Sequence, residues 1–241
     1  MDLNESYYSF QEYDSENEKL IKWREIHGNM FGKVFLSAFE DSPEAQNYLT
    51  VALIKISERS FNDGLSMLQM LEDLCFNDFD CFALYYFIGL CYEFLENEEE
   101  MNEYYKKMME YDINYSFVIY FHPYYRTAKF AQRKSQNAKA LSYYIKALEL
   151  YSQKELDSEK LENMGQIYYD MATICLSCHD YEKSWDLIEK SQKCSPAENP
   201  ERNYIMALLY AIEGKKDEAQ KIVDSLPDYL KGNCEQLIAK I

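Results

Sequence analysis

The fold is decided by the stretch "ALYYFIGLCYEFLENEEEMNEYYKKMMEYDIN", residues 83–114. Gly89 stands among large side chains, and Met101, Met108 and Ile113 follow it after twelve, seven and five residues. The acidic run at 96–100 separates two apolar halves. We interpret the halves as two antiparallel helices joined by an acidic turn, because a small residue on a helix lets the backbone of its neighbour approach closely.

The same spacing recurs four more times. Each copy has a first mark that is a small residue, a second mark twelve residues later and a third seven residues after that: Ala52, Gly64, Leu71; Ala128, Ala140, Ala147; Ala172, Ser184, Ser191; and Ala207, Ala219, Leu226. An apolar residue follows each second mark by four places: Leu68, Tyr105, Tyr144, Ile188 and Val223. Since a single helix pair cannot bury its apolar stripe alone, the pairs are expected to stack.

Over about residues 45–226 this pattern resembles the tetratricopeptide repeat (TPR). The resemblance implies an all-α fold, a right-handed superhelical solenoid of antiparallel helix pairs, with about five repeats and capping helices at both ends. Three features depart from the family's pattern. Met101 and Met108 are large where it prefers Ala, Lys55 replaces a large apolar residue, and the first marks lie 37, 39, 44 and 35 residues apart instead of 34.

The ends of the repeat region predict the domain organisation. Asp41 or Ser42 before Pro43 suits the start of a helix. We therefore expect a mobile segment at 1–14 and a single domain at 15–241. Within that domain, 15–42 form N-terminal helices, 43–226 the repeats, and 227–241 a capping helix.

Composition excludes several classes of protein. The 7 Gly and 5 Pro among 241 residues are too few for an all-β fold with many tight turns. A net charge of −17 disfavours binding to nucleic acid and to anionic membranes, while a basic protein partner is permitted. The first twenty residues do not have the character of a signal peptide, and no apolar run reaches the ~20 residues that span a bilayer. The expected compartment is the cytoplasm.

The sequence "CLSCH", residues 175–179, has the spacing of a covalent haem site. Cys175, however, falls three residues after a first mark, where Tyr92 and Tyr210 stand in other repeats. We therefore expect Cys175 to point into the helix interface and Cys178 toward the helix end, with His179 in the turn. No haem is predicted.

Other chemistry has no clear signature in the chain. A structural zinc site needs four converging Cys or His ligands, and the remaining cysteines belong to other predicted helices. No nucleophile elbow, metalloprotease helix or phosphate-binding loop is found. We expect no catalytic residues, no cofactor and no metal, and hence no enzyme.

A row of tyrosines is the first candidate binding feature. Each of these residues stands three places before a first mark: Tyr86, Tyr125, Tyr169 and Tyr204. The resemblance implies that first helices line a concave, peptide-binding groove, with these rings facing it and the preceding Tyr85, Tyr124 and Tyr168 packed between helices. In the other reading the rings pack against the next first helix and expose only their edges.

A basic stripe is the second candidate. His122, Arg126, Lys129 and Arg133 are spaced i, i+4, i+7 and i+11 on one helix. In one interpretation they anchor a carboxylate of the ligand; in the other, acidic residues such as Glu93 and Asp170 neutralise them internally. The family's anchor for chaperone C-termini is absent, because Tyr86 and Leu90 replace the Lys and Asn that it requires.

The expected function is a non-enzymatic scaffold that binds a protein or peptide segment in the concave groove. The alternative is an acidic inhibitor or immunity-type protein that neutralises a basic partner. A homodimer, in which one chain fills another's groove, is also open.

Overall fold

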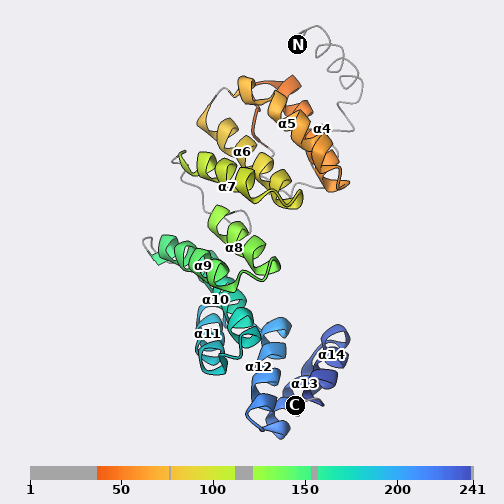
Figure 1. The fold of residues 1–241 in the computed structure, drawn as a ribbon, viewed down its shortest axis with the longest axis vertical. Coiled ribbons are helices and arrows are strands. Elements are labelled where there is room, and N and C mark those ends of the chain that lie inside the picture. The colour runs from red at the N-terminus through yellow and green to blue at the C-terminus, as the bar shows by residue number, and fades with distance from the viewer. Residues whose placement is uncertain (1–36, 76, 112–121, 153–156, 240–241) are drawn as a thin grey trace. The chain divides into compact units, whose positions relative to one another are not determined.

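The computed structural model describes residues 37–75, 77–111, 122–152 and 157–239 (Figure 1). All regular structure within these ranges is helical. The chain divides into two compact units, residues 1–116 and 117–241. The expected mobile segment at 1–14, and the expected helices up to residue 36, lie outside the described residues. One domain over 15–241 stays a prediction.

Over its described residues, the first unit contains two helix pairs joined by a short 3-10 turn. Its elements are α4 (Pro43–Ser57), α5 (Phe61–Met70), η1 (Glu72–Leu74), α6 (Asp78–Phe94) and α7 (Glu98–Met109). Helix α4 packs on α5 and α6 packs on α7, while α5 contacts α6. The Ser42 hydroxyl accepts a hydrogen bond of 3.4 Å from the Ala45 amide, and Pro43 takes the first helical position. The predicted start of this helix is confirmed.

The second unit contains three helix pairs and a final helix. They are α8 (Pro123–Arg133) with α9 (Asn137–Ser152), α10 (Ser158–Ser177) with α11 (Tyr181–Cys194), and α12 (Pro200–Ile212) with α13 (Lys216–Ser225), followed by α14 (Asp228–Ile238). Helix α14 packs on α12 and α13. Its Cys234 is buried in one cluster with Leu208 and Leu226. Helix α14 lies within the residues for which the capping helix is predicted.

The repeat marks are the closest contacts within the pairs. Every first, second and third mark of the five predicted repeats is buried, as are the apolar residues four places after the second marks. A Cβ atom added to Gly89 would lie 2.5 Å from the ring of Tyr105. In the fourth pair the Ser184 hydroxyl donates a hydrogen bond of 3.0 Å to the carbonyl of Ala172. The small residues thus permit the helix approach that their spacing predicted.

The turn inside each pair has one backbone geometry in all five repeats. The residue seven places after each first mark has a positive φ, between 57° and 78°: Arg59, Glu96, Ser135, His179 and Gly214. The next amide donates a hydrogen bond to the carbonyl three places after the mark, as Asp180 does to Cys175 over 2.9 Å. "CLSCH" therefore spans a helix end and its turn. Cys175 is buried and Cys178 exposed, which confirms their predicted positions.

Candidate functional site

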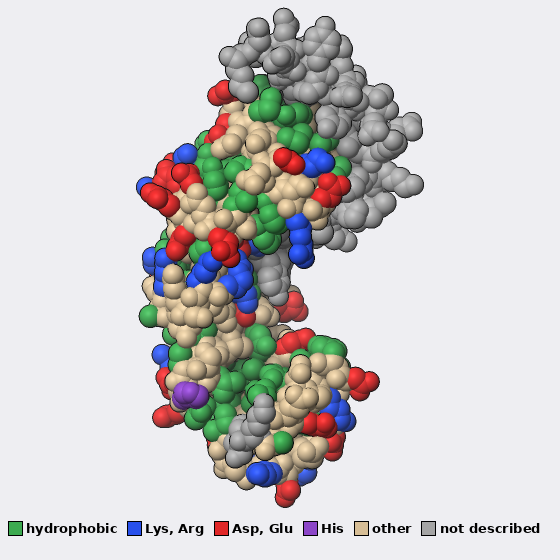
Figure 2. Space-filling view, turned by 45° about the vertical axis from the view of Figure 1, so that its right-hand side comes forward, with side chains coloured by type: hydrophobic (Ala, Val, Ile, Leu, Met, Phe, Trp, Pro, Cys, Tyr) green, Lys and Arg blue, Asp and Glu red, His purple; other side chains and the backbone are tan. Residues whose placement is uncertain are grey.

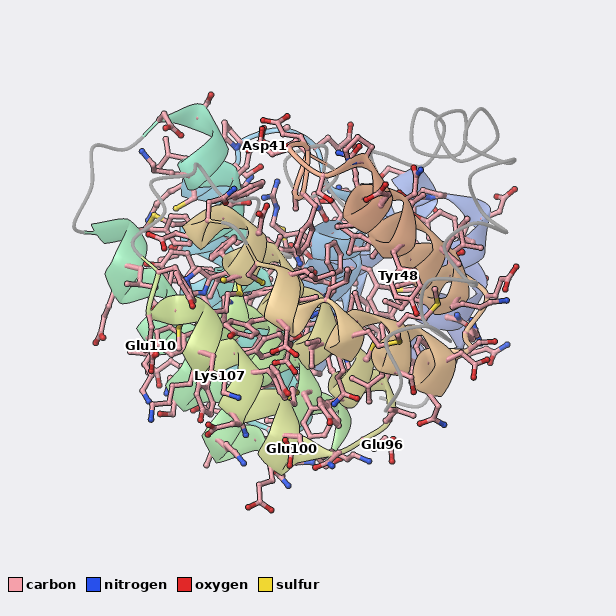
Figure 3. The ribbon with its side chains drawn as sticks, turned by 90° about the horizontal axis from the view of Figure 1, so that it is seen from above. Asp41, Tyr48, Glu96, Glu100, Lys107 and Glu110 are labelled. Carbon is pink, nitrogen blue, oxygen red and sulfur yellow. The ribbon has the colours of Figure 1, made fainter. Side chains whose placement is uncertain are left out.

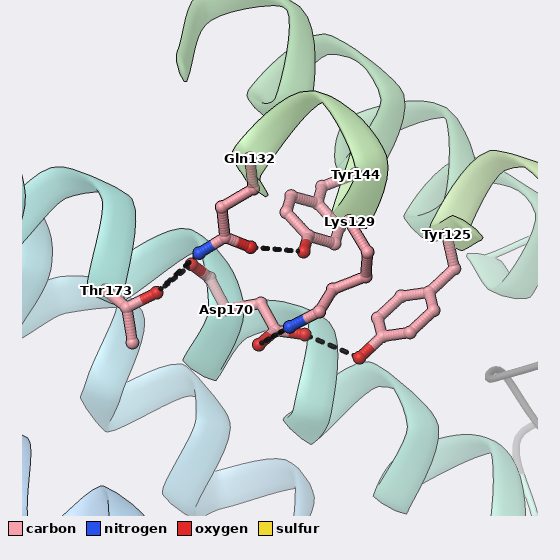
Figure 4. Close-up of polar contacts among 6 residues, drawn as sticks. All are labelled: Tyr125, Lys129, Gln132, Tyr144, Asp170 and Thr173. Carbon is pink, nitrogen blue, oxygen red and sulfur yellow. Dashed lines mark hydrogen bonds and ion pairs between the residues drawn. The ribbon is translucent and has the colours of Figure 1, made fainter. Parts of the chain in front are cut away.

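Most of the predicted binding residues belong to the first helices of the second unit, and three of them, Lys129, Tyr169 and Tyr204, are partly exposed on the face of these helices. We define this first-helix face by five partly exposed side chains: Lys129 and Gln132 of α8, Tyr169 and Thr173 of α10, and Tyr204 of α12. Hydrogen bonds join α8 to α10 across it (Figure 4). In Figure 2, hydrophobic side chains gather on the lower part of the surface. This is about the vertical level at which Figure 1 shows α10, α11 and α12.

A buried carboxylate lies at the centre of the α8–α10 contact. Asp170 is 3% exposed and accepts a hydrogen bond of 2.6 Å from the hydroxyl of Tyr125. The Lys129 ammonium approaches its other oxygen to 3.1 Å (Figure 4). A carboxylate at this depth needs such partners, because burial without them would strongly disfavour its charged form. The three residues thus fix the spacing of two successive first helices.

A second hydrogen-bonded chain extends this network. The Gln132 amide donates to the Thr173 hydroxyl at 3.1 Å and accepts from the Tyr144 hydroxyl at 2.8 Å. Burial raises the pKa of Tyr144, with Asp170 adding to the effect. The sequence reasoning missed Gln132 and Thr173 as site residues. The sequence did hold a signal for this pair, because a polar residue and a tyrosine recur at the same two repeat positions in the second repeat, as Glu93 and Tyr105. There the Tyr105 hydroxyl donates a hydrogen bond of 3.0 Å to Glu93.

The predicted tyrosine row splits into buried and half-buried members. Tyr86, in the first unit, is 1% exposed and stacks on Tyr105 with a centroid distance of 6.4 Å. Tyr125 is 2% exposed and contacts the next first helix through Asp170. Tyr169 and Tyr204 are half-buried and close enough to interact electrostatically; burial raises the pKa of Tyr169 to about 12. Of the four rings in the row, only these last two are partly exposed.

The preceding tyrosines pack against second helices. Tyr85 lies 5.9 Å from Tyr104, and Tyr124 lies 6.2 Å from Tyr143, measured between ring centroids. A lysine of the second helix covers each ring pair, with Lys107 4.4 Å from the Tyr104 centroid. Lys146 repeats this arrangement at 4.9 Å over Tyr143. The cation–π contacts hold these lysines beside the rings, and the packing predicted for Tyr85 and Tyr124 is confirmed.

The members of the basic stripe have different surroundings. His122 caps α8, its ring accepting a hydrogen bond of 3.2 Å from the Tyr124 amide. Lys129 is paired with Asp170, as the second interpretation of the stripe expected for that residue. The Arg133 guanidinium lies 5.7 Å from the centroid of Phe130 and is exposed. Arg126 is partly exposed.

Charge is divided unequally between the two units. Residues 1–116 carry 24 acidic and 8 basic side chains, whereas residues 117–241 carry 18 and 17. The first unit therefore holds a net charge of −16, nearly all of the −17 of the chain. Among the acidic residues of this unit that Figure 3 labels, Glu96 lies in the turn before α7, Glu100 on α7 and Glu110 at its C-terminal end. The first-helix face thus belongs to a nearly neutral unit.

Two further observations concern the described ranges. Within them, no group of three or more His, Cys, Asp or Glu side chains is arranged to hold a metal ion. No helix there is both long enough and apolar enough to cross a membrane.

The architecture is similar to that of solved helical-repeat structures. A signal-transduction ATPase with numerous domains (STAND) protein with a tetratricopeptide repeat sensor, from Pyrococcus horikoshii, matches 98% of this chain at a TM-score of 0.61 and 20% identity, over 36% of its own length. PilF of Pseudomonas aeruginosa matches 79% of this chain over 76% of its own length, with a TM-score of 0.54 and 16% identity. MamA of Desulfovibrio magneticus RS-1 matches 81% of this chain over 96% of its own length, with a TM-score of 0.53 and 14% identity. No family model matches the sequence, and no curated protein matches it significantly.

Proposed function

Starting from the tetratricopeptide-repeat fold, we propose that the chain is a non-enzymatic interaction module that binds a segment of a partner protein on the first-helix face of its second unit. The observation that carries this proposal is the pair Tyr169 and Tyr204. Both rings are half-buried, and their hydroxyl groups are close enough to interact electrostatically. Tyrosine supplies a large contact area and a hydroxyl group at a low cost in conformational entropy.

The network beneath the face supports the proposal. Asp170, Lys129 and Tyr125 hold α8 against α10, so the surface is rigid before a ligand binds. A preorganised surface loses less entropy on binding than a flexible one. Tyr125 has a supporting role in this scheme, since it is buried, and Tyr86 belongs to the other unit.

The ligand is expected to be weakly acidic where it meets α8. Arg126 and Arg133 lie on the same helix as Lys129, and guanidinium groups bind carboxylates with charge-assisted hydrogen bonds. Because Lys129 is already paired with Asp170, we expect its contribution to a ligand contact to be small. Self-association through the same face is a further possibility that sedimentation analysis would test.

A second candidate function rests on the charge division. A unit with a net charge of −16 attracts a basic protein over a long range, and that attraction weakens with added salt. In this alternative the first unit binds, as in an acidic inhibitor of a basic partner, and the first-helix face is a structural surface.

Two matched variants separate these functions. Tyr169→Ser with Tyr204→Ser removes the rings of the face, and Glu99→Gln with Glu103→Gln and Glu110→Gln removes three exposed charges of α7. Each is compared with the wild type for capture of partners from a lysate, at low and at moderate salt, after circular dichroism has shown that it is folded. A partner lost only by the tyrosine variant supports the first function. A partner retained by that variant, and lost with salt or with the α7 charges, supports the second.

A further inference from the structure

Four tyrosines of the first unit form a continuous set of ring contacts at the α6–α7 pair. The ring centroid of Tyr104, on α7, lies 5.9 Å from that of Tyr85 and 5.6 Å from that of Tyr92, both on α6. The Tyr111 ring, just after α7, lies 6.0 Å from that of Tyr85. Tyr104 is 7% exposed, whereas the other three rings are partly exposed. We call these four residues the tyrosine cluster; it presents accessible rings around a buried one.

The tyrosine cluster already holds one cation. The ammonium nitrogen of Lys107, which Figure 3 labels on α7, lies 4.4 Å from the ring centroid of Tyr104 and 5.9 Å from that of Tyr85. The faces of aromatic rings carry negative charge density and attract a cation at such distances. The Lys107 side chain is partly exposed, so the place that its ammonium occupies is open to water.

The second unit contains a smaller version of this arrangement. The Lys146 ammonium lies 5.8 Å from the ring centroid of Tyr124 and 4.9 Å from that of Tyr143. At the repeat position of Tyr92, however, the second unit has the buried Ala131. The tyrosine cluster thus adds a further ring to a pair of rings that two repeats share, and Lys146 provides a matched comparison for Lys107.

We propose that the tyrosine cluster binds an arginine side chain of a basic partner segment, which takes the place of the Lys107 ammonium. This inference rests on the second candidate function, in which the first unit attracts a basic protein. A guanidinium group is planar, stacks on aromatic faces and is more weakly hydrated than an ammonium. Lys107 has a flexible side chain and a strongly hydrated head, so its ammonium moves into water when the guanidinium enters.

The charge around the tyrosine cluster favours this ligand. The first unit has a net charge of −16, which draws basic segments toward it. Burial raises the pKa of the Glu72 carboxyl in η1, and the positive charge of Lys107 opposes this shift. Burial and the negative charge of Glu100 raise the pKa of Tyr92. An incoming guanidinium therefore supplies the positive charge that these acidic side chains lose when Lys107 leaves the rings.

The test is the binding of a synthetic peptide to the full-length protein and to matched lysine variants. The peptide alternates arginine with glycine and carries an uncharged dye, so that fluorescence anisotropy reports binding. Lys107→Ala removes the resident cation, whereas Lys106→Ala removes an exposed charge from the adjacent position of α7. Both variants change the net charge equally. At moderate salt we expect Lys107→Ala to bind the peptide about two- to fivefold more tightly than Lys106→Ala does, and Lys146→Ala to behave like Lys106→Ala.

Ring variants and a neutral peptide keep the proposal falsifiable. Added to Lys107→Ala, Tyr85→Leu removes a ring and should cancel the gain in affinity, while Tyr85→Phe retains the ring and should preserve it. Circular dichroism shows whether each variant is folded. A peptide with citrulline in place of arginine keeps the shape without the charge and should not bind.

The proposal is overturned if Lys107→Ala and Lys106→Ala bind the arginine peptide equally, if the gain survives Tyr85→Leu, or if the citrulline peptide binds as well. Salt-sensitive binding of the arginine peptide that is equal in all variants would support the second candidate function without the tyrosine cluster. Failure of the wild type and of every variant to bind the peptide would contradict both.

Discussion

Tyr125 and Asp170 are 45 residues apart in the sequence and are joined by a hydrogen bond of 2.6 Å. This contact connects the first helices of two successive repeats, and Lys129 completes it at 3.1 Å. Its polar groups are oriented by one another. The network therefore positions the first-helix face, and the repeat spacing alone does not predict this network.

Removing Lys129 is the most direct test of that network. In Lys129→Met the buried Asp170 retains the Tyr125 hydroxyl but loses its cation, and we expect a loss of about 1–3 kcal/mol in the free energy of unfolding. The loss is smaller than for a fully buried pair because the Lys129 side chain is 36% exposed. Adding Asp170→Asn to this variant should restore part of the stability. Urea unfolding measures the wild type and both variants, and an unchanged midpoint for Lys129→Met would contradict the account.

The close approach of α6 and α7 predicts a different result for two glycines. Gly89→Ala places a methyl group 2.5 Å from the buried ring of Tyr105, and overpacking of this kind costs about 1–3 kcal/mol. Gly232, in α14, has no atom within 4 Å of the same position, so Gly232→Ala should stabilise the helix by about 0.5–1 kcal/mol. Thermal unfolding of the two variants gives the comparison. Stabilisation of both would mean that Gly89 is not needed for packing.

The common turn geometry makes opposite predictions at two equivalent positions. Ser135 has a φ of 57° and Gly214 a φ of 78°, in the region that costs a residue with a side chain about 1–2 kcal/mol. Ser135→Gly should therefore raise stability, because it removes the strain of the side chain at this φ. The increase should be slight, because the greater freedom of glycine in the unfolded chain offsets part of it. Gly214→Ala should lower stability by about 1 kcal/mol. Equal effects of the same sign would show that the turn strain is absent.

The buried tyrosines predict the behaviour of the protein at alkaline pH. Burial raises the pKa of Tyr104 and of Tyr169 to about 12, whereas an unfolded tyrosine has a pKa of about 10. The unfolded chain thus loses these protons first, so their contribution to stability is intact below about pH 10 and falls as the pH rises toward 12. As the pH is raised, the phenolate absorbance of these two tyrosines should appear at a higher pH than that of unfolded tyrosine. It should rise together with the loss of helical circular dichroism. Full ionisation while the helices persist would contradict the burial of Tyr104 and the partial burial of Tyr169.

The fold was predictable because packing imposes a spacing on the sequence. Small residues at Ala52, Ala128 and Ala207, with partners twelve residues later, have one physical use in a helical chain, which is close helix approach. The same spacing located the turn at His179 and so settled the interpretation of Cys175 and Cys178. The start of α4 followed from Ser42 and Pro43, because capping depends on adjacent residues.

The candidate site was less predictable, because its contacts join residues far apart in sequence. The position of Tyr125 matched that of Tyr169, yet one ring is 2% exposed and the other is half-buried, a difference made by Asp170 on the next helix. Arg202 resembles a surface charge in the sequence. It is 4% exposed and donates hydrogen bonds of 2.7 and 2.6 Å to the carbonyls of Ser195 and Ala197 at and just beyond the end of α11. Such partners are set by tertiary packing and not by local pattern.

The measurement that tests the central claim most directly is site-specific photo-crosslinking of the captured partner. Benzoylphenylalanine replaces Tyr169 on the first-helix face in one protein and Ile145, an exposed residue of α9, in another. We predict that the partner is crosslinked from position 169 and not from position 145, with the attached peptide identified by mass spectrometry. Crosslinking from position 145 alone would contradict the proposed function. So would a product obtained only when the benzoylphenylalanine replaces an acidic residue of α7 such as Glu103, because either result places the partner elsewhere.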